Sequence, residues 1–132
     1  MGYLLDTNMI SDLVRHRQGA VARHIREIGE EAIATSIIVA AELRFGAAKR
    51  GAQRLTQRIE AVLARLAVLP FAAPADAVYA ALRVRLERTG RPIGGNDLLI
   101  AAHAVAGGHI LVTDDRDFGR IAELSCENWL AA

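Results

Sequence analysis

The chain has 132 residues, of which 52% are hydrophobic and 23% are charged, and its formal net charge at pH 7 is +1. This length favours a single domain, 1–132, with one core, and a near-neutral charge does not by itself indicate a nucleic-acid-binding protein. The single cysteine, Cys126, excludes a disulfide framework or a thiolate metal site within one chain. No stretch resembles a signal peptide or a membrane span, so we expect a cytoplasmic protein with no membrane partner.

Short apolar stretches alternate with longer segments of helical periodicity along the chain. The apolar stretches predict strands at 3–5, 32–36, 67–71, 109–113 and 124–130. Apolar residues at three- and four-residue steps predict helices at 9–15, 20–28, 37–50, 54–66, 74–90 and 96–108. Strands that alternate with helices are typical of an α/β fold with a mainly parallel central sheet. Ligands of such sheets bind beyond the carboxyl ends of the strands, which is where we expect the chemistry.

Acidic residues follow two of the predicted strands at that edge. Asp6 comes directly after the first strand, and the stretch "TDDRDF" follows the strand at 109–113. Taken alone, Asp6 is a helix cap, and the loop aspartates form a solvated surface. Thr7 or Asn8 is equally suited to cap the helix that follows, and we expect one of them to do so. Asp6 would then be free to bind a ligand.

Two more carboxylates lie on predicted helices that begin near the same edge. Glu42 shares the apolar side of its helix with Val39 and Phe45, so it must be paired, protonated or bound to a metal. Asp97 lies in the first turn of a nearly all-apolar helix, for which Asn96 is the expected N-cap. Taken singly, Glu42 is explained by a buried pair with an arginine, and Asp97 by the helix dipole alone.

Four distant segments are therefore expected to bring carboxylates to one edge of the sheet. Like charges placed so closely are costly unless a cation lies between them, and oxygen ligands favour Mg²⁺ or Mn²⁺. The four histidines show no ligand spacing; we expect His103 to be a hydrogen-bonded core residue and Cys126 a packed one. Acidic Mg²⁺ sites mostly serve phosphoryl chemistry, so hydrolysis of a phosphodiester by metal-activated water is the expected reaction.

Four stretches of the chain match the acidic motifs of a known family in order and spacing. These are "LLDTNMIS", "IIVAAELRFGA", "IGGNDLLIAAHA" and "LVTDDRDF", and they resemble the motifs of PIN-domain ribonucleases, most closely the VapC-type toxins of bacterial toxin–antitoxin pairs. The resemblance spans almost the whole chain, down to "ENWL". It implies a three-layer α/β/α sandwich and an endoribonuclease that depends on Mg²⁺, for which Mn²⁺ can substitute.

The resemblance also implies which acids act. Asp6, Glu42 and Asp97 would be catalytic, and Asp6 and Asp97 would hold the metal together with one aspartate of "TDDRDF". That loop is one residue shorter than in many relatives, which leaves its ligand open. In order of preference, the candidates for this fourth acid are Asp115, Asp117 and, as an outer member, Asp114.

Further roles and partners follow from the same resemblance. Thr7, Asn8 and Thr113 would orient the carboxylates through hydrogen bonds. The substrate would be RNA, with tRNA the commonest target of such toxins. The partners would be a small VapB-like antitoxin that blocks the acidic pocket, and a second copy of the chain in a homodimer.

Other protein classes with acidic pockets fit less well. A phosphoacceptor receiver domain needs an acidic pair after the first strand and a late lysine, whereas the only lysine here is Lys49. An aspartyl-phosphatase needs a second aspartate where Asn8 stands. The remaining alternative is a catalytically silent PIN-like module that binds RNA or protein, against which the presence of all four acidic places argues.

Overall fold

A computed structural model describes residues 2–130 and contains a five-stranded sheet whose neighbouring strands all pair in parallel. The strands are β1 (Tyr3–Leu5), β2 (Ile33–Ser36), β3 (Ala67–Leu69), β4 (Ile110–Val112) and β5 (Cys126–Glu127). The helices are α1 (Thr7–Arg15), α2 (Ala20–Ile28), α3 (Ile37–Arg50), α4 (Gln53–Arg65), α5 (Ala75–Arg88) and α6 (Gly95–Gly107). Short 3₁₀ turns form η1 (Glu30–Ala32) and η2 (Arg116–Arg120). The predicted α/β fold with a parallel sheet is confirmed.

The order of the strands places β1 at the centre of the sheet. From edge to edge the order is β3, β2, β1, β4 and β5, and Leu5 lies opposite Thr35 on one side and Val112 on the other. The chain builds outward from β1 to β3 and then crosses to β4 on the opposite side. The switch in direction lies between β1 and β4, and open α/β sheets bind ligands in the crevice beyond the strands at such a switch.

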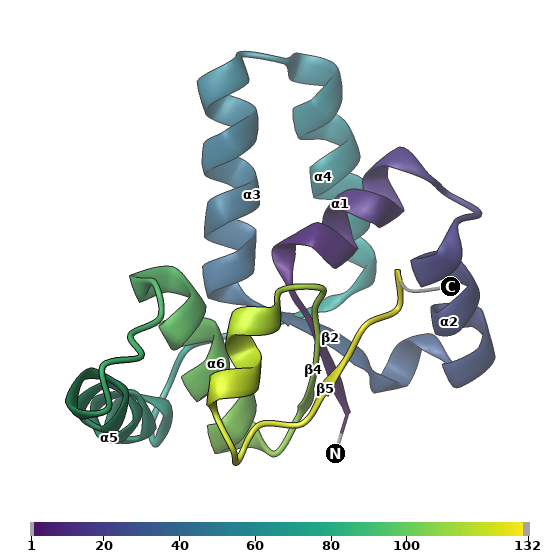
Figure 1. The fold of residues 1–132 in the computed structure, drawn as a ribbon. Coiled ribbons are helices and arrows are strands. Elements are labelled where there is room, and N and C mark those ends of the chain that lie inside the picture. The colour runs from purple at the N-terminus through teal and green to yellow at the C-terminus, as the bar shows by residue number, and fades with distance from the viewer. Residues whose placement is uncertain (1, 131–132) are drawn as a thin grey trace.

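The helices form layers on both sides of this sheet (Figure 1). Helices α5 and α6 lie on one side, and α1 and α2 lie on the other. Helices α3 and α4 rise beyond the carboxyl edge of the sheet as an upright pair. The carboxyl ends of the strands are therefore surrounded by the beginnings of α1, α3 and α6. Within residues 2–130, no helix combines the length and the apolar character needed to cross a bilayer.

The core explains why the central strands are so apolar in sequence. Leu4 and Leu5 of β1 and Leu111 and Val112 of β4 are fully buried, because helices cover both sides of a parallel sheet. Helix α6 is buried along most of its length, as its nearly continuous apolar sequence predicts. Trp129 is also buried, and its ring stacks on His24 of α2.

The ends of the elements follow local backbone chemistry. Ser36 caps α3 by accepting a hydrogen bond from the Ile38 N–H at 3.1 Å. Gly51 and Gly108 end α3 and α6 with φ values of 64° and 67°, a left-handed conformation that glycine adopts without strain. The strand predicted at 67–71 ends at Leu69, because Pro70 has no N–H to donate to a neighbouring strand.

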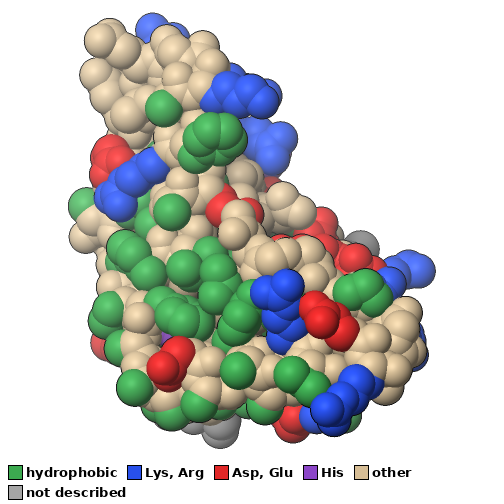
Figure 2. Space-filling model, turned by 90° about the vertical axis from the view of Figure 1, so that its left-hand side faces the viewer, with side chains coloured by type: hydrophobic (Ala, Val, Ile, Leu, Met, Phe, Trp, Pro, Cys, Tyr) green, Lys and Arg blue, Asp and Glu red, His purple; other side chains and the backbone are tan. Residues whose placement is uncertain are grey.

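Hydrophobic side chains also gather on the surface, on the side of the molecule where α3 and α5 lie (Figure 2). The large exposed hydrophobics of these two helices are Ile37, Phe45 and Val84, which we call the apolar face. Phe45 is 67% exposed, so the prediction that it lies on the buried side of α3 together with Glu42 is wrong. Because α3 projects beyond the sheet, this side of the helix has no layer to pack against.

Candidate active site

Asp6 and Thr113 meet at the switch point between β1 and β4. The Asp6 N–H donates to the Val112 carbonyl at 2.9 Å, which extends the pairing of the two strands by one residue. The Thr113 hydroxyl donates to Asp6 Oδ2 at 2.7 Å, and Asp6 is only 6% exposed. Thr113 Oγ1 in turn accepts from the Asp115 N–H at 3.1 Å. The central strands thus fix one carboxylate and the start of the acidic loop.

Asp6 also caps α1. Its backbone is extended, with φ −76° and ψ 170°, and its Oδ1 accepts from the Thr7 N–H at 2.8 Å. The prediction that Thr7 or Asn8 takes the cap is therefore wrong, because the chain turns into α1 directly after β1 and both residues already lie inside the helix. Asp6 serves as the cap and still presents its carboxylate at the sheet edge.

Glu42 of α3 accepts hydrogen bonds from the first turns of α1 and α6. Its Oε1 accepts from the Thr7 hydroxyl at 2.9 Å, and its Oε2 accepts from the Asn96 side chain at 3.5 Å. No arginine pairs with it among the described residues, and the neighbouring Arg44 binds Glu60 instead, at 2.8 Å. The alternative of a buried Glu42–arginine pair is therefore wrong.

Asp97 lies in the first turn of α6, half-buried. The N-cap of this helix is Gly94, which provides no side-chain cap, so the prediction of an Asn96 cap is wrong. The helix begins one residue earlier than its apolar pattern indicates, and this places Asn96 inside the first turn, where its amide turns to Glu42. Sequence reasoning missed this contact, because no local pattern links residues 54 positions apart.

The three loop aspartates have different surroundings. Asp115 is half-buried, and its Oδ1 accepts from the Asp117 N–H at 2.9 Å, which caps η2. Asp117 is exposed and pairs with Arg120 at 3.2 Å. Asp114 is exposed and accepts from the Asn8 amide at 2.9 Å. Asp115 is therefore the loop carboxylate that is both partly buried and free of an arginine.

The carboxylates influence one another strongly. Burial raises the pKa of Asp97 from 3.8 to about 6, and nearby charges add to the effect. Those charges belong to Asp6, Asp115, Glu42 and Asp117. Burial also raises the pKa of Asp6, and the hydrogen bonds from Thr113 and Thr7 counteract part of the rise. Acids from four distant segments therefore lie near enough to repel one another.

A divalent cation matches the chemistry of this set. In the described part of the chain, no lysine, arginine or histidine forms an ion pair with any of four acids: Asp6, Glu42, Asp97 and Asp115. Uncompensated, partly buried carboxylates favour a hard cation with oxygen ligands. As they stand, however, no three His, Cys, Asp or Glu side chains of residues 2–130 are placed to hold a metal ion. Binding one requires the carboxylates to close toward one another.

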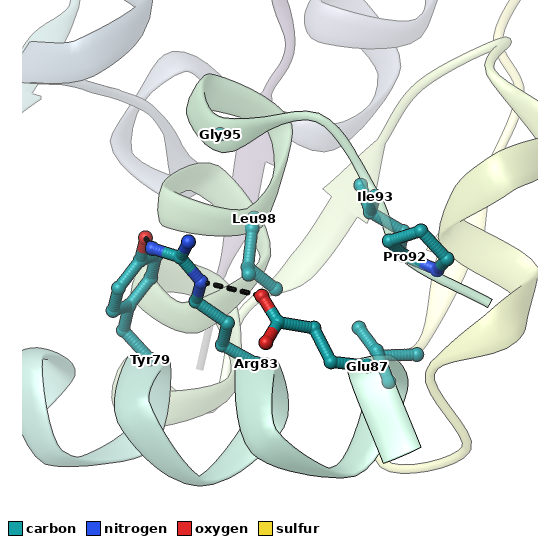
Figure 3. Close-up of a pocket in the computed structure, with 8 residues that line it drawn as sticks. Tyr79, Arg83, Glu87, Pro92, Ile93, Gly95 and Leu98 are labelled. Carbon is teal, nitrogen blue, oxygen red and sulfur yellow. Dashed lines mark hydrogen bonds and ion pairs between the residues drawn. The ribbon is translucent and has the colours of Figure 1, made fainter. Parts of the chain in front are cut away.

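Two hollows lie between the helices, and one of them reaches the acidic cluster. A cavity of about 110 Å³ between α5 and α6 reaches Gly95 at the start of α6 (Figure 3). Its polar groups satisfy one another, because Arg83 binds both Glu87 at 2.9 Å and the Tyr79 hydroxyl at 3.0 Å. A larger groove of about 390 Å³ runs between α1, α3 and α4, and it meets the cluster at Glu42.

Two residues outside the cluster complete the comparison with the sequence. His103 is 6% exposed and bonded to Ser36 at 2.7 Å, which confirms the prediction of a hydrogen-bonded core histidine. Cys126 is exposed, so the prediction of a packed cysteine is wrong. It lies in β5, an edge strand, where no further strand covers it.

Comparisons with known proteins agree with this site. The PIN domain family matches residues 3–124. The chain is 37% identical over 132 residues to Ribonuclease VapC2 of Rickettsia felis, covering 98% of both chains. It is 32% identical over 129 residues to the tRNA(fMet)-specific endonuclease VapC of Shigella flexneri, covering 96% of this chain and 97% of that one.

Solved structures of VapBC complexes also match this chain. The crystal structure of VapBC2 from Rickettsia felis bound to a promoter DNA fragment matches with a TM-score of 0.89 and 36% identity, covering 98% of this chain and 99% of that one. DNA-bound VapBC from Salmonella typhimurium matches with a TM-score of 0.90 and 29% identity, covering 98% of each chain. The chain therefore belongs to the PIN-domain family and, within it, to the VapC-type toxin ribonucleases, as its motifs predict.

The raised pKa of Asp97 predicts how stability depends on pH without metal. Between about pH 4 and pH 6 the folded state keeps a proton that the unfolded chain has lost, so stability falls as pH rises and stays low above this window. In EDTA at pH 7.5, Asp97→Asn should raise Tm, by on the order of 3 °C, and flatten this pH dependence. Thermal unfolding followed by circular dichroism measures both.

The matched control is Asp76→Asn, which changes an exposed first-turn acid of α5. It should not raise Tm at pH 7.5. Identical stability curves for Asp97→Asn and the wild type would contradict the assigned electrostatics of the cluster.

Proposed function

We propose that the chain is a Mg²⁺-dependent endoribonuclease that hydrolyses RNA phosphodiesters, acting in the cytoplasm as the toxin of a VapBC-type pair. The observation that carries the proposal is the convergence of Asp6, Glu42, Asp97 and Asp115 at the switch point of the sheet without a protein cation. Membership of the VapC-type ribonucleases supports it. The catalytically silent alternative is disfavoured because all four acids are present and free of arginine.

Asp6, Asp97 and Asp115 would hold the ion. A bound Mg²⁺ would supply a Lewis acid that polarises the phosphate and lowers the pKa of water, a role in which Mn²⁺ can substitute. Asp115 is preferred to Asp117 as the fourth acid, because Arg120 already neutralises Asp117. Raised carboxyl pKa values are consistent with a site whose charge a cation is meant to balance.

The remaining side chains would hold these groups in place. The Thr113 hydroxyl orients Asp6, and the Thr7 hydroxyl orients Glu42. Asn8 binds Asp114 at the outer rim, which keeps the start of the loop close to α1. Glu42, fixed by two donors, would accept the proton of the attacking water. The orienting roles of Thr113, Thr7 and Asn8 are ones that hydrogen-bonding residues commonly perform around a metal site.

The proposed substrate is RNA, with tRNA as the favoured class. The Shigella flexneri relative is named as specific for tRNA(fMet), and the chain aligns with it over nearly its whole length. Cleavage by metal-activated water needs no nucleophilic side chain.

Purified protein should cut RNA when Mg²⁺ or Mn²⁺ is supplied and stop when EDTA is added. Asp97→Asn and Asp115→Asn should each lower kcat/KM by more than about 100-fold, since each removes a charge that holds the ion. Asp117→Asn should retain most activity, because its carboxylate is already paired. Initial rates on a labelled tRNA pool measure these effects.

Asp76→Asn is again the neutral control. If Asp115→Asn and Asp117→Asn lowered kcat/KM equally, the assignment of Asp115 as the fourth acid would be wrong. RNA binding without any metal-dependent product would instead support the silent module.

A VapB-like antitoxin is the proposed inhibitor, and the groove between α1, α3 and α4 is its proposed binding site. The groove is lined by apolar side chains, including Leu43 and Ile59, and it ends at Glu42. Arg15 and Arg50 also line it, and neither forms an ion pair among the described residues. An amphipathic segment whose acidic side chains face Arg15 and Arg50 would complement this surface, and its apolar side would cover the groove up to Glu42. The solved VapBC complexes among the relatives support a partner of this kind.

Arg50→Glu should weaken binding of a cognate VapB-like antitoxin by roughly 10-fold, because it places a negative charge opposite an acidic partner. Titration calorimetry measures the affinity, and nuclease assays measure the inhibition. Arg88→Glu, at the end of α5 and outside the groove, should leave both unchanged. Equal affinities for Arg50→Glu and Arg88→Glu would move the antitoxin away from this groove.

A homodimer is proposed through the apolar face formed by Ile37, Phe45 and Val84. Burying these side chains against a second copy would remove exposed hydrophobic surface from water. Phe45→Asp should shift the protein from dimer to monomer in light scattering at micromolar concentration. Ala61→Asp, an exposed change on α4, which contributes no residue to the apolar face, is the control and should stay dimeric. A monomeric wild type would contradict the proposal.

A further inference from the structure

A polar contact lies buried between the two helices that carry Glu42 and Asp97. Ser36 Oγ and His103 Nδ1 are 2.7 Å apart, with Ser36 fully buried and His103 only 6% exposed. Ser36 is the last residue of β2 and the N-cap of α3, and His103 lies in the middle of α6. The contact therefore joins the start of one site helix to the body of the other.

The Ser36 hydroxyl serves both the α3 cap and the histidine. Ser36 Oγ accepts from the Ile38 N–H at 3.1 Å, and it keeps a hydroxyl proton and a second lone pair for His103 Nδ1. Which of these two atoms donates depends on the tautomer of the ring. Burial lowers the pKa of His103, with a smaller contribution from His109, and this favours the neutral ring. A neutral ring can bond to the serine through Nδ1 in either tautomer.

Packing alone does not explain a histidine at this position. Its neighbours along α6, including Ala102 and Ala104, are buried and apolar, and a leucine would fill such a site without a polar atom to satisfy. The ring is also held from the side by Phe71, which meets it edge-on at 5.7 Å with an interplanar angle of 89°. A buried polar pair of this kind specifies one arrangement of the elements that it joins.

Helices α3 and α6 contact each other through polar side chains at two places. Ser36, the N-cap of α3, contacts His103, and Asn96 of α6 contacts Glu42 at 3.5 Å. Ser36 precedes Glu42 by six residues and His103 follows Asp97 by six, so each buried partner lies about 9 Å along its helix from its acid. Repulsion between Glu42 and Asp97 tends to separate the helices near the Asn96–Glu42 contact. The Ser36–His103 contact opposes sliding or separation of the two helices.

We propose that Ser36 and His103 are positioning residues, whose hydrogen bond fixes α3 against α6 so that the carboxylates of Glu42 and Asp97 can act on the same centre. The inference rests on the proposed nuclease function. It adds two residues that touch neither the substrate nor the ion and act only through the helices that they join.

The test compares substitutions at position 103 that keep or remove the polar atom bonded to Ser36. In His103→Asn the side-chain amide occupies the same place along the side chain as Nδ1 and can accept or donate, whereas His103→Leu has no polar atom there. His103→Leu should lower kcat by about 10- to 100-fold with KM nearly unchanged, and Mn²⁺ affinity measured by electron paramagnetic resonance should fall to a similar extent. His103→Asn should stay within about threefold of the wild type in both measurements, because it restores the hydrogen bond.

Leu63→Ala is the control for stability, since it empties a buried site on α4 away from this contact. It should lower Tm and leave kcat and Mn²⁺ affinity unchanged at a temperature where the protein is folded. If His103→Leu does not fold, His103→Ala replaces it, because it also lacks the polar atom and leaves the α3 cap intact. Ser36→Thr and Ser36→Ala give a second comparison, in which alanine removes the cap together with the contact to His103.

The outcomes separate this inference from the function on which it rests. A folded His103→Leu or Ser36→Ala variant with wild-type kcat and Mn²⁺ affinity would overturn the positioning role while the nuclease stands. The positioning role would also be overturned if His103→Asn and Ser36→Thr lost as much kcat and Mn²⁺ affinity as the variants without the hydrogen bond. A wild-type protein that neither cuts RNA nor binds Mn²⁺ would overturn the proposed function, and the positioning role with it.

Discussion

Repulsion among four carboxylates is the constraint that the rest of the structure must withstand. Asp6, Glu42, Asp97 and Asp115 come from separate segments, and each segment is anchored by apolar burial elsewhere. The central strands hold the first acid, and the buried body of α6 holds the third. The donors that contact the cluster are hydroxyl, amide and backbone N–H groups, which orient carboxylates without neutralising them. The fold therefore keeps the negative charge available for a cation.

Much of this arrangement could be predicted because the strands of a parallel sheet have a simple pattern in the sequence. Strands covered on both sides are short apolar runs, and Asp6 is noticeable because it ends one of them. Asp97 is noticeable for a similar reason, as an acid at the head of the nearly all-apolar α6. The rule that ligands lie beyond the carboxyl ends of strands then places both acids at one edge before any coordinates are known.

What could not be predicted depends on contacts between distant residues or on exact turns. The start of α6 at Gly95, one residue early, decides that Asn96 reaches Glu42 rather than capping its own helix. Phe45 looked buried because periodicity marks the apolar side of a helix and not whether another layer covers it. The loop aspartates differ through hydrogen bonds within η2, and helical or strand periodicity carries no information about these bonds.

The double use of Asp6 has a consequence for how such a chain can lose its activity. Alanine at this position would remove both the carboxylate and the cap of α1, at a cost of about 1 kcal/mol in folding, whereas asparagine would remove the charge and keep the cap. Loss of the charge and loss of the α1 cap are therefore separable at position 6. Asparagine or serine removes the charge and can still cap the helix, whereas a hydrophobic residue removes both.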